Sequence, residues 1–502
     1  MTRLLVITAL RTEYGALRGH VDGARLERCG MGPLRARQWS PTAGEAPRAV
    51  VVAGLAGGLD PTMRPGDVLV ASEVRDADGC AMLRAAAPLV AVLRSLGLRV
   101  HSGPLISADR IVDSAAERAD LAATGALAVD MESAALVRTV REQLGEIPVA
   151  VVRVIVDTPT SPLGGIGTVP AGIHALRTLR AIGPRLGQWA DMAGPHRVVL
   201  AAPRSFCAGV QRAIDVVELA LQRYPHPVYV RRQIVHNAHV VAELRRQGAV
   251  FVEELDEVPD GSTVVFSAHG VAPAVHAEAE RRELTVIDAT CPLVTKVHNR
   301  ARRFLARGDT VFLIGHAGHD ETEGTMGQAP GQITLIENAA EAERVTVEDP
   351  TRVALLMQTT LAVDEVADTV EVLQRRFPQI KSANSDDICY ATTNRQQAVS
   401  AIADEADVVI VLGSGNSSNS LRLVEVAERH GAPAHLIDDV TELRPEWLTG
   451  RTSVGITAGA SAPAHLVDEV IAALGALGPL EVVERVITNE GVAFALPKGV
   501  AV

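Results

Sequence analysis

The chain has 502 residues, which is too long for one hydrophobic core and predicts about three domains, or a few more if they are small. Its 48 basic and 60 acidic residues give a formal net charge of −12, and no stretch combines a block of basic residues with interleaved aromatic side chains. These features argue against nucleic acid and anionic membranes as partners, while a local basic pocket for a small anionic substrate stays possible.

The N-terminal segment predicts a strand rather than an export signal. "MTRLLVITALRTEYGAL" has a short apolar run that is broken by Arg11 and Glu13, and no small-residue cleavage site follows. No window approaches the ~18 uninterrupted apolar residues of a membrane helix. The five cysteines are widely spaced and odd in number, which argues against a disulfide framework. We therefore expect a cytoplasmic protein with no membrane span.

The chain divides into two halves of α/β character. Residues 1–192 alternate β-rich apolar runs with helical Ala/Leu/Arg patterns, and the Gly- and Pro-bearing residues 193–198 predict a linker. Residues 199–502 repeat a unit of apolar run, polar turn and helix. Runs such as "VVLAA", "TVVFS", "TVIDA", "TVFLIG" and "DVVIVLG" are too continuous for half-exposed antiparallel strands, so they predict parallel strands covered by helices on both faces.

Polar turns follow five of these runs in the second half. They are "AHG" after "VVFS", "HAGHDETEGT" after "VFLIG", "QTT" after "ALLM", "SGNSSNS" after "VIVLG" and "AGASAP" after "VGIT". Open α/β sheets bind ligands at the carboxyl ends of their strands. Five such turns therefore predict one shared site.

Three cysteines, Cys207, Cys291 and Cys389, each stand where a strand or loop gives way to a helix. A helix N-terminus favours the thiolate over the thiol. The CxxC pairs of closed zinc sites are missing from the sequence, so three converging thiolates fit an iron–sulfur cluster with one iron free of protein ligands. That open iron could act as a Lewis acid and electron donor. Three unrelated buried thiols remain the alternative at this point.

A polar set accompanies these cysteines in the predicted turns. Such a set could hold a diphosphate through neutral donors and supply protons from a carboxyl group. "GSGNSSNS" offers backbone amides and hydroxyls at a helix start, but it lacks the lysine of a nucleotide P-loop. The candidate side chains are His236, His269, His319, Glu321, Thr359, Ser417, Ser418, Asn419 and Ser461.

Nine ordered motifs in residues 198–498 together resemble the hydroxymethylbutenyl diphosphate reductase family, the last enzymes of the methylerythritol phosphate route to isoprenoids. The motifs are "PRSFCAGVQRAI", "IVHNAHVV", "FSAHGV", "IDATCPLVTKVH", "GHDETEGTMGQ", "MQTTL", "DDICYATTNRQ", "GSGNSSNS" and "TAGASAP". The resemblance implies reductive dehydroxylation of (E)-4-hydroxy-3-methylbut-2-enyl diphosphate to isopentenyl and dimethylallyl diphosphates. It also implies a three-lobed α/β fold around a 4Fe-4S cluster, with electrons from a ferredoxin or flavodoxin.

The resemblance assigns a role to each candidate residue by its motif position. Glu321 would be the proton donor and Thr359 would contact the substrate's hydroxyl group. The cluster would have three ligands, Cys207, Cys291 and Cys389. The diphosphate would bind to His236, His269, His319, Ser417, Ser418, Asn419 and Ser461. Two departures stand out: Ser205 where the family usually has glycine, and Asp320 where it usually has proline.

Residues 2–190 resemble the purine nucleoside phosphorylase and nucleosidase superfamily. The matching pieces are "ITALRTEYGAL", "CGMGPLRA", "AGLAGGLDPTMRPGDVLVAS", "VDMESAAL" and "VVRVIVDT". By position, Glu13 would orient an attacking water, Glu132 would hold the ribose hydroxyls, and Asp157 would protonate the purine leaving group. Fusion to an isoprenoid enzyme suggests a hopanoid-linked nucleoside as the substrate.

Several alternatives stay open for the N-terminal half. Between "EVRDADG" and "GPLISADRIV" the chain is shorter than in the nucleosidases, and that stretch helps to build the base pocket. Hydrolysis and phosphorolysis are both possible, and the domain could be a non-catalytic nucleoside-binding module. A rival reading of the whole chain is a zinc- or cluster-stabilised binding protein whose N-terminal domain senses nucleosides.

Overall fold

The structure is a computed structural model that describes residues 3–21, 23–161, 168–382 and 387–500. Asp386, the first residue of the "DDICY" motif, lies outside them. Contacts divide the chain into two compact units. The first comprises Met1–Val198, Asp439–Val454 and Asp468–Val482, and the second comprises Val199–Asp438, Gly455–Val467 and Val483–Val502.

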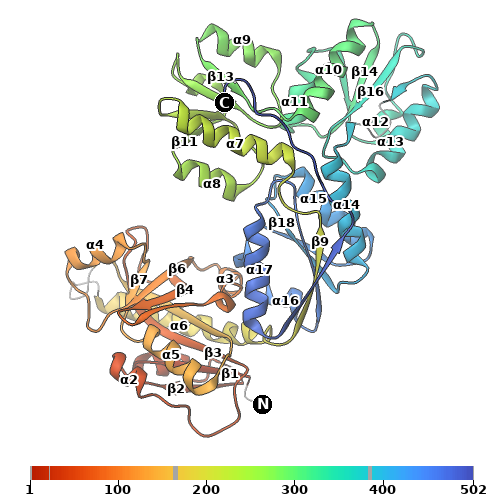
Figure 1. Cartoon of the computed structure of the whole chain (residues 1–502). Coiled ribbons are helices and arrows are strands. Elements are labelled where there is room, and N and C mark those ends of the chain that lie inside the picture. The colour runs from red at the N-terminus through yellow and green to blue at the C-terminus, as the bar shows by residue number, and fades with distance from the viewer. Residues whose placement is uncertain (1–2, 22, 162–167, 383–386, 501–502) are drawn as a thin grey trace. The chain divides into compact units, whose positions relative to one another are not determined.

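The first half of the chain is built on an eight-stranded mixed sheet (Figure 1). Its order is β2-β1-β3-β7-β6-β4-β5, and β8 pairs with both β3 and β4, so five of the strands close into a ring. The strands are β1 Leu4–Thr8, β2 Ala24–Arg28, β3 Ala49–Gly58, β4 Val68–Asp76, β5 Gly79–Met82, β6 Val100–Ser107, β7 Ala128–Asp130 and β8 Val149–Asp157. The predicted N-terminal strand is β1, and all five of its residues are buried.

The helices of this half are α1 Arg11–Leu17, α2 Pro33–Arg37, α3 Leu89–Arg94, α4 Ala115–Ala123, α5 Ser133–Leu144 and α6 Thr168–Ala190. A short 3₁₀ turn, η1 Arg84–Ala86, also lies in this half. The next strand, β9 His196–Ala202, begins inside the six residues predicted as a linker.

Three separate sheets make up the second half, in agreement with the predicted three-lobed α/β fold (Figure 1). Their orders are β11-β10-β12-β13, β15-β14-β16-β17 and β19-β18-β20-β9-β21. The strands are β10 Val228–Arg231, β11 Ala249–Val252, β12 Thr263–Phe266, β13 Thr285–Asp288, β14 Thr310–Ile314, β15 Ile333–Ile336, β16 Val353–Met357, β17 Lys381–Ser382, β18 Val408–Leu412, β19 Ala434–Ile437, β20 Ser453–Ala458 and β21 Leu480–Val486.

Parallel pairing was predicted from the continuous apolar runs, and it holds throughout the two four-stranded sheets. Strands β12, β16 and β18 are buried along their whole lengths. β13 differs, because it lies at the edge of its sheet and leaves Thr285 exposed. An apolar run thus predicted the strand but not its edge position.

Helices follow most of these strands, as the repeated unit predicts. They are α7 Ala208–Arg223, α8 Ala238–Arg246, α9 Pro273–Arg281, α10 Pro292–Ala306, α11 Asp320–Met326, α12 Ala339–Ala342, α13 Val363–Arg376, α14 Tyr390–Ala403, α15 Ser418–Arg429, α16 Pro445–Leu448 and α17 Ala464–Leu477. Short 3₁₀ turns lie at η2 Leu255–Glu257 and η4 Val440–Glu442.

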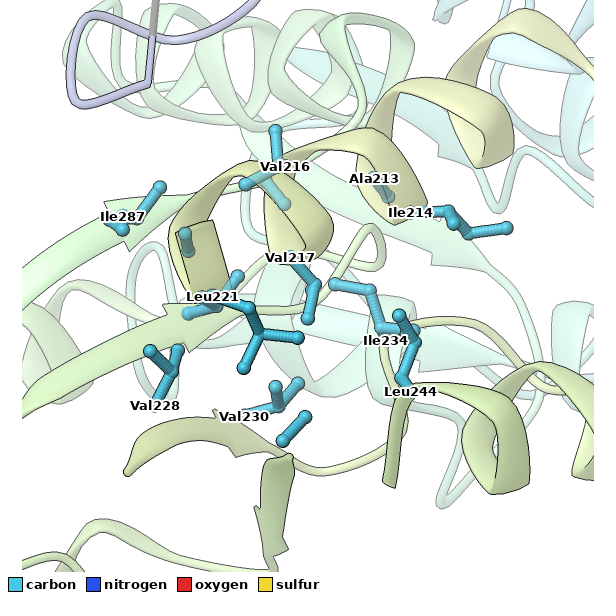
Figure 2. Packing of buried hydrophobic residues seen from close by; sticks show 14 of the residues in the cluster. Ala213, Ile214, Val216, Val217, Leu221, Val228, Val230, Ile234, Leu244 and Ile287 are labelled. Carbon is cyan, nitrogen blue, oxygen red and sulfur yellow. The ribbon is translucent and has the colours of Figure 1, made fainter. Parts of the chain in front are cut away.

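The packing of α7 shows how these helices are fixed on their sheets. Its apolar residues recur at helical spacing, so one stripe of the helix faces β10 and its neighbours. Figure 2 shows Val217 and Leu221 of this stripe beside Val228 and Val230 of β10. Burying each such side chain contributes roughly 1.5–3 kcal/mol. The N-terminus of α7, where Cys207 lies, is therefore held rigidly.

Candidate functional site

The three candidate cysteines occupy equivalent positions in the fold. Cys207, Cys291 and Cys389 are the N-cap residues of α7, α10 and α14. The backbone N–H of Val210 donates to Cys207 Sγ over 3.5 Å, and Cys389 Sγ lies 3.5 Å from Thr392 Oγ1. Each sulfur thus lies at the positive end of a helix, which favours a bound anion or thiolate.

The cysteines converge on one small space beside Gly209. A Cβ atom added to Gly209 would lie 2.7 Å from Cys291 Sγ and 3.8 Å from Cys207 Sγ. Burial, followed by repulsion between the neighbouring thiolates, raises the pKa of Cys291 to about 12 and that of Cys389 to about 11. A shared positive group between the sulfurs would reverse this effect, because metal binding requires and stabilises thiolates. The three thiols, and the space that Gly209 leaves beside them, fit an iron–sulfur cluster.

Glu321 is buried, and Thr359 holds its carboxyl group through two hydrogen bonds. The backbone N–H of Thr359 donates to Oε1 over 2.7 Å, and its hydroxyl donates to Oε2 over 2.9 Å. Burial is the largest cause that raises the pKa of Glu321 to about 7, although both hydrogen bonds act in the opposite direction. The carboxyl is therefore suited to gain and lose a proton near neutral pH.

The three histidines gather at another part of the same pocket. The rings of His236 and His269 stack with centroids 4.1 Å apart, and His319 meets them edge-on with centroids 5.5 and 5.8 Å away. His319 is the N-cap of α11, where its Nδ1 accepts a hydrogen bond from the backbone N–H of Glu321. Burial lowers the pKa of each imidazole, to about 4 for His319, so all three favour the neutral form.

Hydroxyl and amide groups complete the polar lining. Ser417 Oγ lies 3.4 Å from Ser461 Oγ, and Ser461 donates to the backbone carbonyl of His236. Asn419 Oδ1 accepts a hydrogen bond from the Ala460 N–H. The Nδ2 of Asn419 is buried and has no hydrogen-bond partner among the described residues. Ser418 Oγ lies 3.2 Å from Thr360 Oγ1. These groups can donate to an anion without carrying charge.

One pocket, with about 690 Å³ of empty volume, brings all of these predicted reductase residues together. It is lined by the three cysteines, the three histidines, Glu321, Thr359, Ser417, Ser418, Asn419 and Ser461. Among the other lining residues, Gly209, Thr360 and Thr392 had no predicted role. Each lies within three positions of a predicted site residue in the sequence. That closeness is the sequence signal by which they could have been predicted.

A second pocket lies in the first unit and contains all three N-terminal candidates, Glu13, Glu132 and Asp157. Glu13 accepts hydrogen bonds from the backbone N–H groups of Ala9, Leu10 and Leu55, which fix its carboxylate. Glu132 accepts from the N–H of Gly32 over 2.7 Å, and burial raises its pKa.

Asp157 has a partner that sequence reasoning missed. Buried Arg118, on α4, donates to its carboxylate through Nη2 and also donates to the backbone carbonyl of Val112. Burial raises the pKa of Asp157, and the charge of Arg118 opposes that rise. No local pattern signals this pairing, since the two residues are 39 positions apart.

Residues 198–475, more than half of the chain, match the family model described as LytB protein. The chain belongs to the LytB protein family. Residues 10–165 match the model described as Phosphorylase superfamily. The resemblances predicted for the two halves are thus confirmed at the level of families.

Residues 198–475, called the LytB part below, are similar to known reductases over most of the length of those proteins. The chain is 60% identical over 303 residues to 4-hydroxy-3-methylbut-2-enyl diphosphate reductase of Acidothermus cellulolyticus, covering 60% of this chain and 89% of that protein. It is 57% identical over 311 residues to 4-hydroxy-3-methylbut-2-enyl diphosphate reductase 2 of Mycobacterium bovis, covering 61% and 94%. The solved E-1-hydroxy-2-methyl-but-2-enyl-4-diphosphate reductase of Plasmodium falciparum is 34% identical, with a TM-score of 0.58, over 61% of this chain and 97% of that one. Among the described residues, none of the helices has the length and apolar character needed to cross a bilayer.

The first departure from the usual LytB pattern, Ser205, has a structural consequence. Its φ of 60° lies in the left-handed region that favours glycine, and its buried hydroxyl has no hydrogen-bond partner among the described residues. The fully buried Arg395 donates to its backbone carbonyl over 2.7 and 3.1 Å and so holds this conformation. The serine therefore carries strain that glycine would not.

Ser205→Gly is expected to raise the free energy of unfolding of the LytB part by about 1 kcal/mol, because it removes a Cβ from the left-handed region and a buried unpaired hydroxyl. Differential scanning calorimetry of the full chain would measure the shift. Glu283→Gly, at an exposed left-handed residue, is the matched control because it relieves strain alone and should stabilise less. A lower unfolding temperature for Ser205→Gly would contradict the prediction.

Proposed function

We propose that the LytB part reduces (E)-4-hydroxy-3-methylbut-2-enyl diphosphate to isopentenyl and dimethylallyl diphosphates. The observation that carries this proposal is the single pocket in which three thiols, a carboxyl group of near-neutral pKa and a set of neutral donors meet. The names of the relatives point to the same reaction. The reaction adds two electrons and two protons, breaks the allylic C–O bond, and releases the hydroxyl oxygen as water.

Cys207, Cys291 and Cys389 would hold one 4Fe-4S cluster through three cysteine ligands. Bound there, the cluster would supply electrons one at a time and a Lewis-acidic iron. The space beside Gly209 supports this choice, because a side chain there would collide with the sulfur of Cys291. We expect a ferredoxin or flavodoxin in the cytoplasm to be the electron donor.

The polar lining would bind and orient the diphosphate. Buried imidazole, hydroxyl and amide groups are already desolvated, so they can donate to phosphate oxygens without losing strong bonds to water. Asn419 supports this role because its Nδ2 is buried and lacks a partner among the described residues. The set comprises His236, His269, His319, Ser417, Ser418, Asn419 and Ser461.

Glu321 and Thr359 would deliver the proton that lets the hydroxyl group leave. In its neutral form Glu321 can donate to Thr359 Oγ1, and that hydroxyl can in turn donate to the substrate's oxygen. The 2.9 Å separation between Thr359 Oγ1 and Glu321 Oε2 supports such a relay. Hydroxide is a poor leaving group, so protonation must accompany the arrival of electrons.

Anaerobic purification, Mössbauer spectroscopy and turnover of the diphosphate with a reduced viologen would test the reductase proposal. We expect an iron-loaded protein that consumes the substrate and releases the two five-carbon diphosphates. A colourless, iron-free protein that is folded and inactive would support the rival class, a zinc-stabilised binding protein.

We further propose that the N-terminal unit cleaves the N-glycosidic bond of a purine nucleoside. The supporting observation is that Glu13, Glu132 and Asp157 line one pocket. Glu13, fixed by three backbone N–H groups, would orient the attacking group, and Glu132 would bind the ribose hydroxyls. A hopanoid-linked nucleoside is suggested by the fusion to an isoprenoid enzyme alone. The alternative is a nucleoside-binding module without catalysis.

Asp157→Asn is expected to lower adenine release from adenosyl compounds by roughly 100- to 10,000-fold, because an amide cannot protonate the leaving purine. Chromatography of released adenine, with and without inorganic phosphate, would measure the effect and separate phosphorolysis from hydrolysis. Asp120→Asn, at an exposed position of α4, is the matched control. Equal release by the Asp157 variant and the unchanged protein would rule out this acid, and no release by either would favour the binding module.

A further inference from the structure

Helix α10 presents a basic face to solvent. Residues 292–308 contain five basic and no acidic residues, although acidic residues outnumber basic ones by 60 to 48 in the whole chain. Lys296, Arg303 and Arg307 are exposed and lie seven and four positions apart, which places them on one side of the helix. This side of α10, called the basic face below, carries positive charge in a chain whose formal net charge is −12.

Two carboxylates adjoin α10, and both are buried. Asp387, which pairs with Arg300, and Asp309, which follows the helix, have side chains that are 0% exposed. Arg352 and Lys381 both contact Asp309, and their side chains are 50% and 43% exposed. The end of the basic face therefore adds positive charge to the surface instead of neutralising it.

The other two helices that begin at the site cysteines lack such a face. In α7, Asp215 and Glu218 balance Arg212 and Arg223, and Arg212 is buried. The charged residue of α14 is Arg395, which is fully buried. A negatively charged partner is therefore attracted to α10 rather than to α7 or α14.

The exposed surface of α10 reaches the residue that bears the thiol. Thr295 is exposed, and its backbone N–H and its hydroxyl both donate to the backbone carbonyl of Cys291, over 3.0 and 3.3 Å. At a rise of about 1.5 Å per residue, Lys296 lies roughly 7.5 Å along the helix from Cys291. A protein bound to the basic face would thus lie close to the group that the three thiols hold.

The helix dipole explains only part of this charge. Cations in the last turn stabilise a helix, which suits Arg303. The effect fades beyond that turn, so it does not explain Lys296. Arg302 is also exposed, and its printed side-chain partners, Gln328 and Asn299, carry no charge. The positive charge of the face therefore fits recognition of a partner better than stabilisation of the helix.

We propose that the basic face of α10, from Lys296 to Arg307, is the docking surface for an acidic one-electron carrier protein of the ferredoxin or flavodoxin type. The proposal rests on the proposed reductase function. Two encounters would supply the two electrons of one turnover, and each would leave one carrier oxidised by one electron. The basic face would attract and orient the carrier, whereas the acidic remainder of the chain would repel it from other positions.

Isothermal titration of the cluster-loaded full chain with an acidic 2Fe-2S ferredoxin, under anaerobic conditions, tests the docking surface. We expect the double variant Lys296→Glu, Arg303→Glu to bind the ferredoxin roughly tenfold or more weakly. The affinity of the unchanged protein should fall as salt is added. The matched control reverses two exposed arginines in the last turn of α8, Arg245→Glu with Arg246→Glu, and should stay within about twofold.

Turnover separates this proposal from the reductase proposal. The α10 variant should lose a similar factor in kcat/KM for the reduced ferredoxin and keep its turnover with a reduced viologen, a small molecule that needs no docking surface. Equal ferredoxin affinity in the α10 variant and the unchanged protein, or equal losses in the α10 and α8 variants, would overturn the docking surface. Lack of viologen turnover in the unchanged protein would instead refute the reductase function. If the α10 variant does not fold, Lys296→Gln with Arg303→Gln decides, and unchanged affinity there would also overturn the proposal.

Discussion

Glu321→Gln is expected to keep the iron of the LytB pocket and to lose reductase turnover by roughly 100- to 10,000-fold, the usual contribution of a positioned acid. Glutamine has nearly the same shape and can still accept the hydrogen bond from the Thr359 N–H. It cannot supply a proton to the leaving hydroxyl group. Turnover with a reduced viologen, together with Mössbauer spectra of the same samples, would measure both properties.

The pH profile gives this prediction a second measurable outcome. With a pKa of about 7 in the free protein, Glu321 is protonated below neutral pH and ionised above it. The kcat/KM of the unchanged protein should therefore fall as the pH rises through about 7, and the residual rate of Glu321→Gln should not follow that step. Glu323→Gln, on the same helix but exposed, is the matched control and should retain both rate and profile.

The same shift links Glu321 to stability. Its pKa rises from 4.5 to about 7 on burial, so the folded state binds the proton more tightly than the unfolded state. This contribution to the free energy of unfolding is fully present below pH 4.5 and is lost as the pH rises through 7. The free energy of unfolding of Glu321→Gln, relative to that of the unchanged protein, should thus be higher at pH 8 than at pH 5. Retained turnover in Glu321→Gln would refute the proton-donor role, whatever its stability.

The sequence predicted the elements of the LytB part well because their signals are local. Continuous apolar runs indicated parallel strands, and Pro292 directly after Cys291 indicated the start of a helix, which is where α10 begins. Polar turns at strand ends predicted one shared site, and within each sheet parallel strands do direct their turns to a common edge. That the turns of three separate sheets meet in one pocket is set by tertiary packing. The edge position of β13 was not predictable, because burial depends on which strand pairs beside it.

Features that depend on contacts between distant residues escaped the sequence. Gly209 looked like an ordinary helix residue, yet its missing side chain makes room for the sulfur of Cys291, which is 82 positions away in the sequence. Arg118 gave no sign that it would pair with Asp157. Asp320 was visible as a departure from the usual pattern, but only the fold shows that it faces two imidazoles. Local patterns carry secondary structure and motif identity, whereas electrostatic partners are set by tertiary packing.

Cys291→Ser is expected to lose the cluster, with iron content near background and turnover abolished. A serine oxygen is a harder ligand than a thiolate and ionises far less readily, so it binds iron poorly in a site built for sulfur. Without this thiolate, the cluster would have only two cysteine ligands. Iron analysis and Mössbauer spectroscopy of anaerobically purified protein would measure the loss.

Cys80→Ser is the matched control, because Cys80 is exposed in the first unit and lines neither pocket described above. It should retain full iron content and turnover. The raised pKa values of Cys291 and Cys389 add a further expectation, since both thiols must lose protons when the cluster enters. Reconstitution of the iron-free protein should therefore release protons and become less complete as the pH is lowered. Full iron loading in Cys291→Ser would show that this thiol is buried packing and that the three helix starts do not form one cluster site.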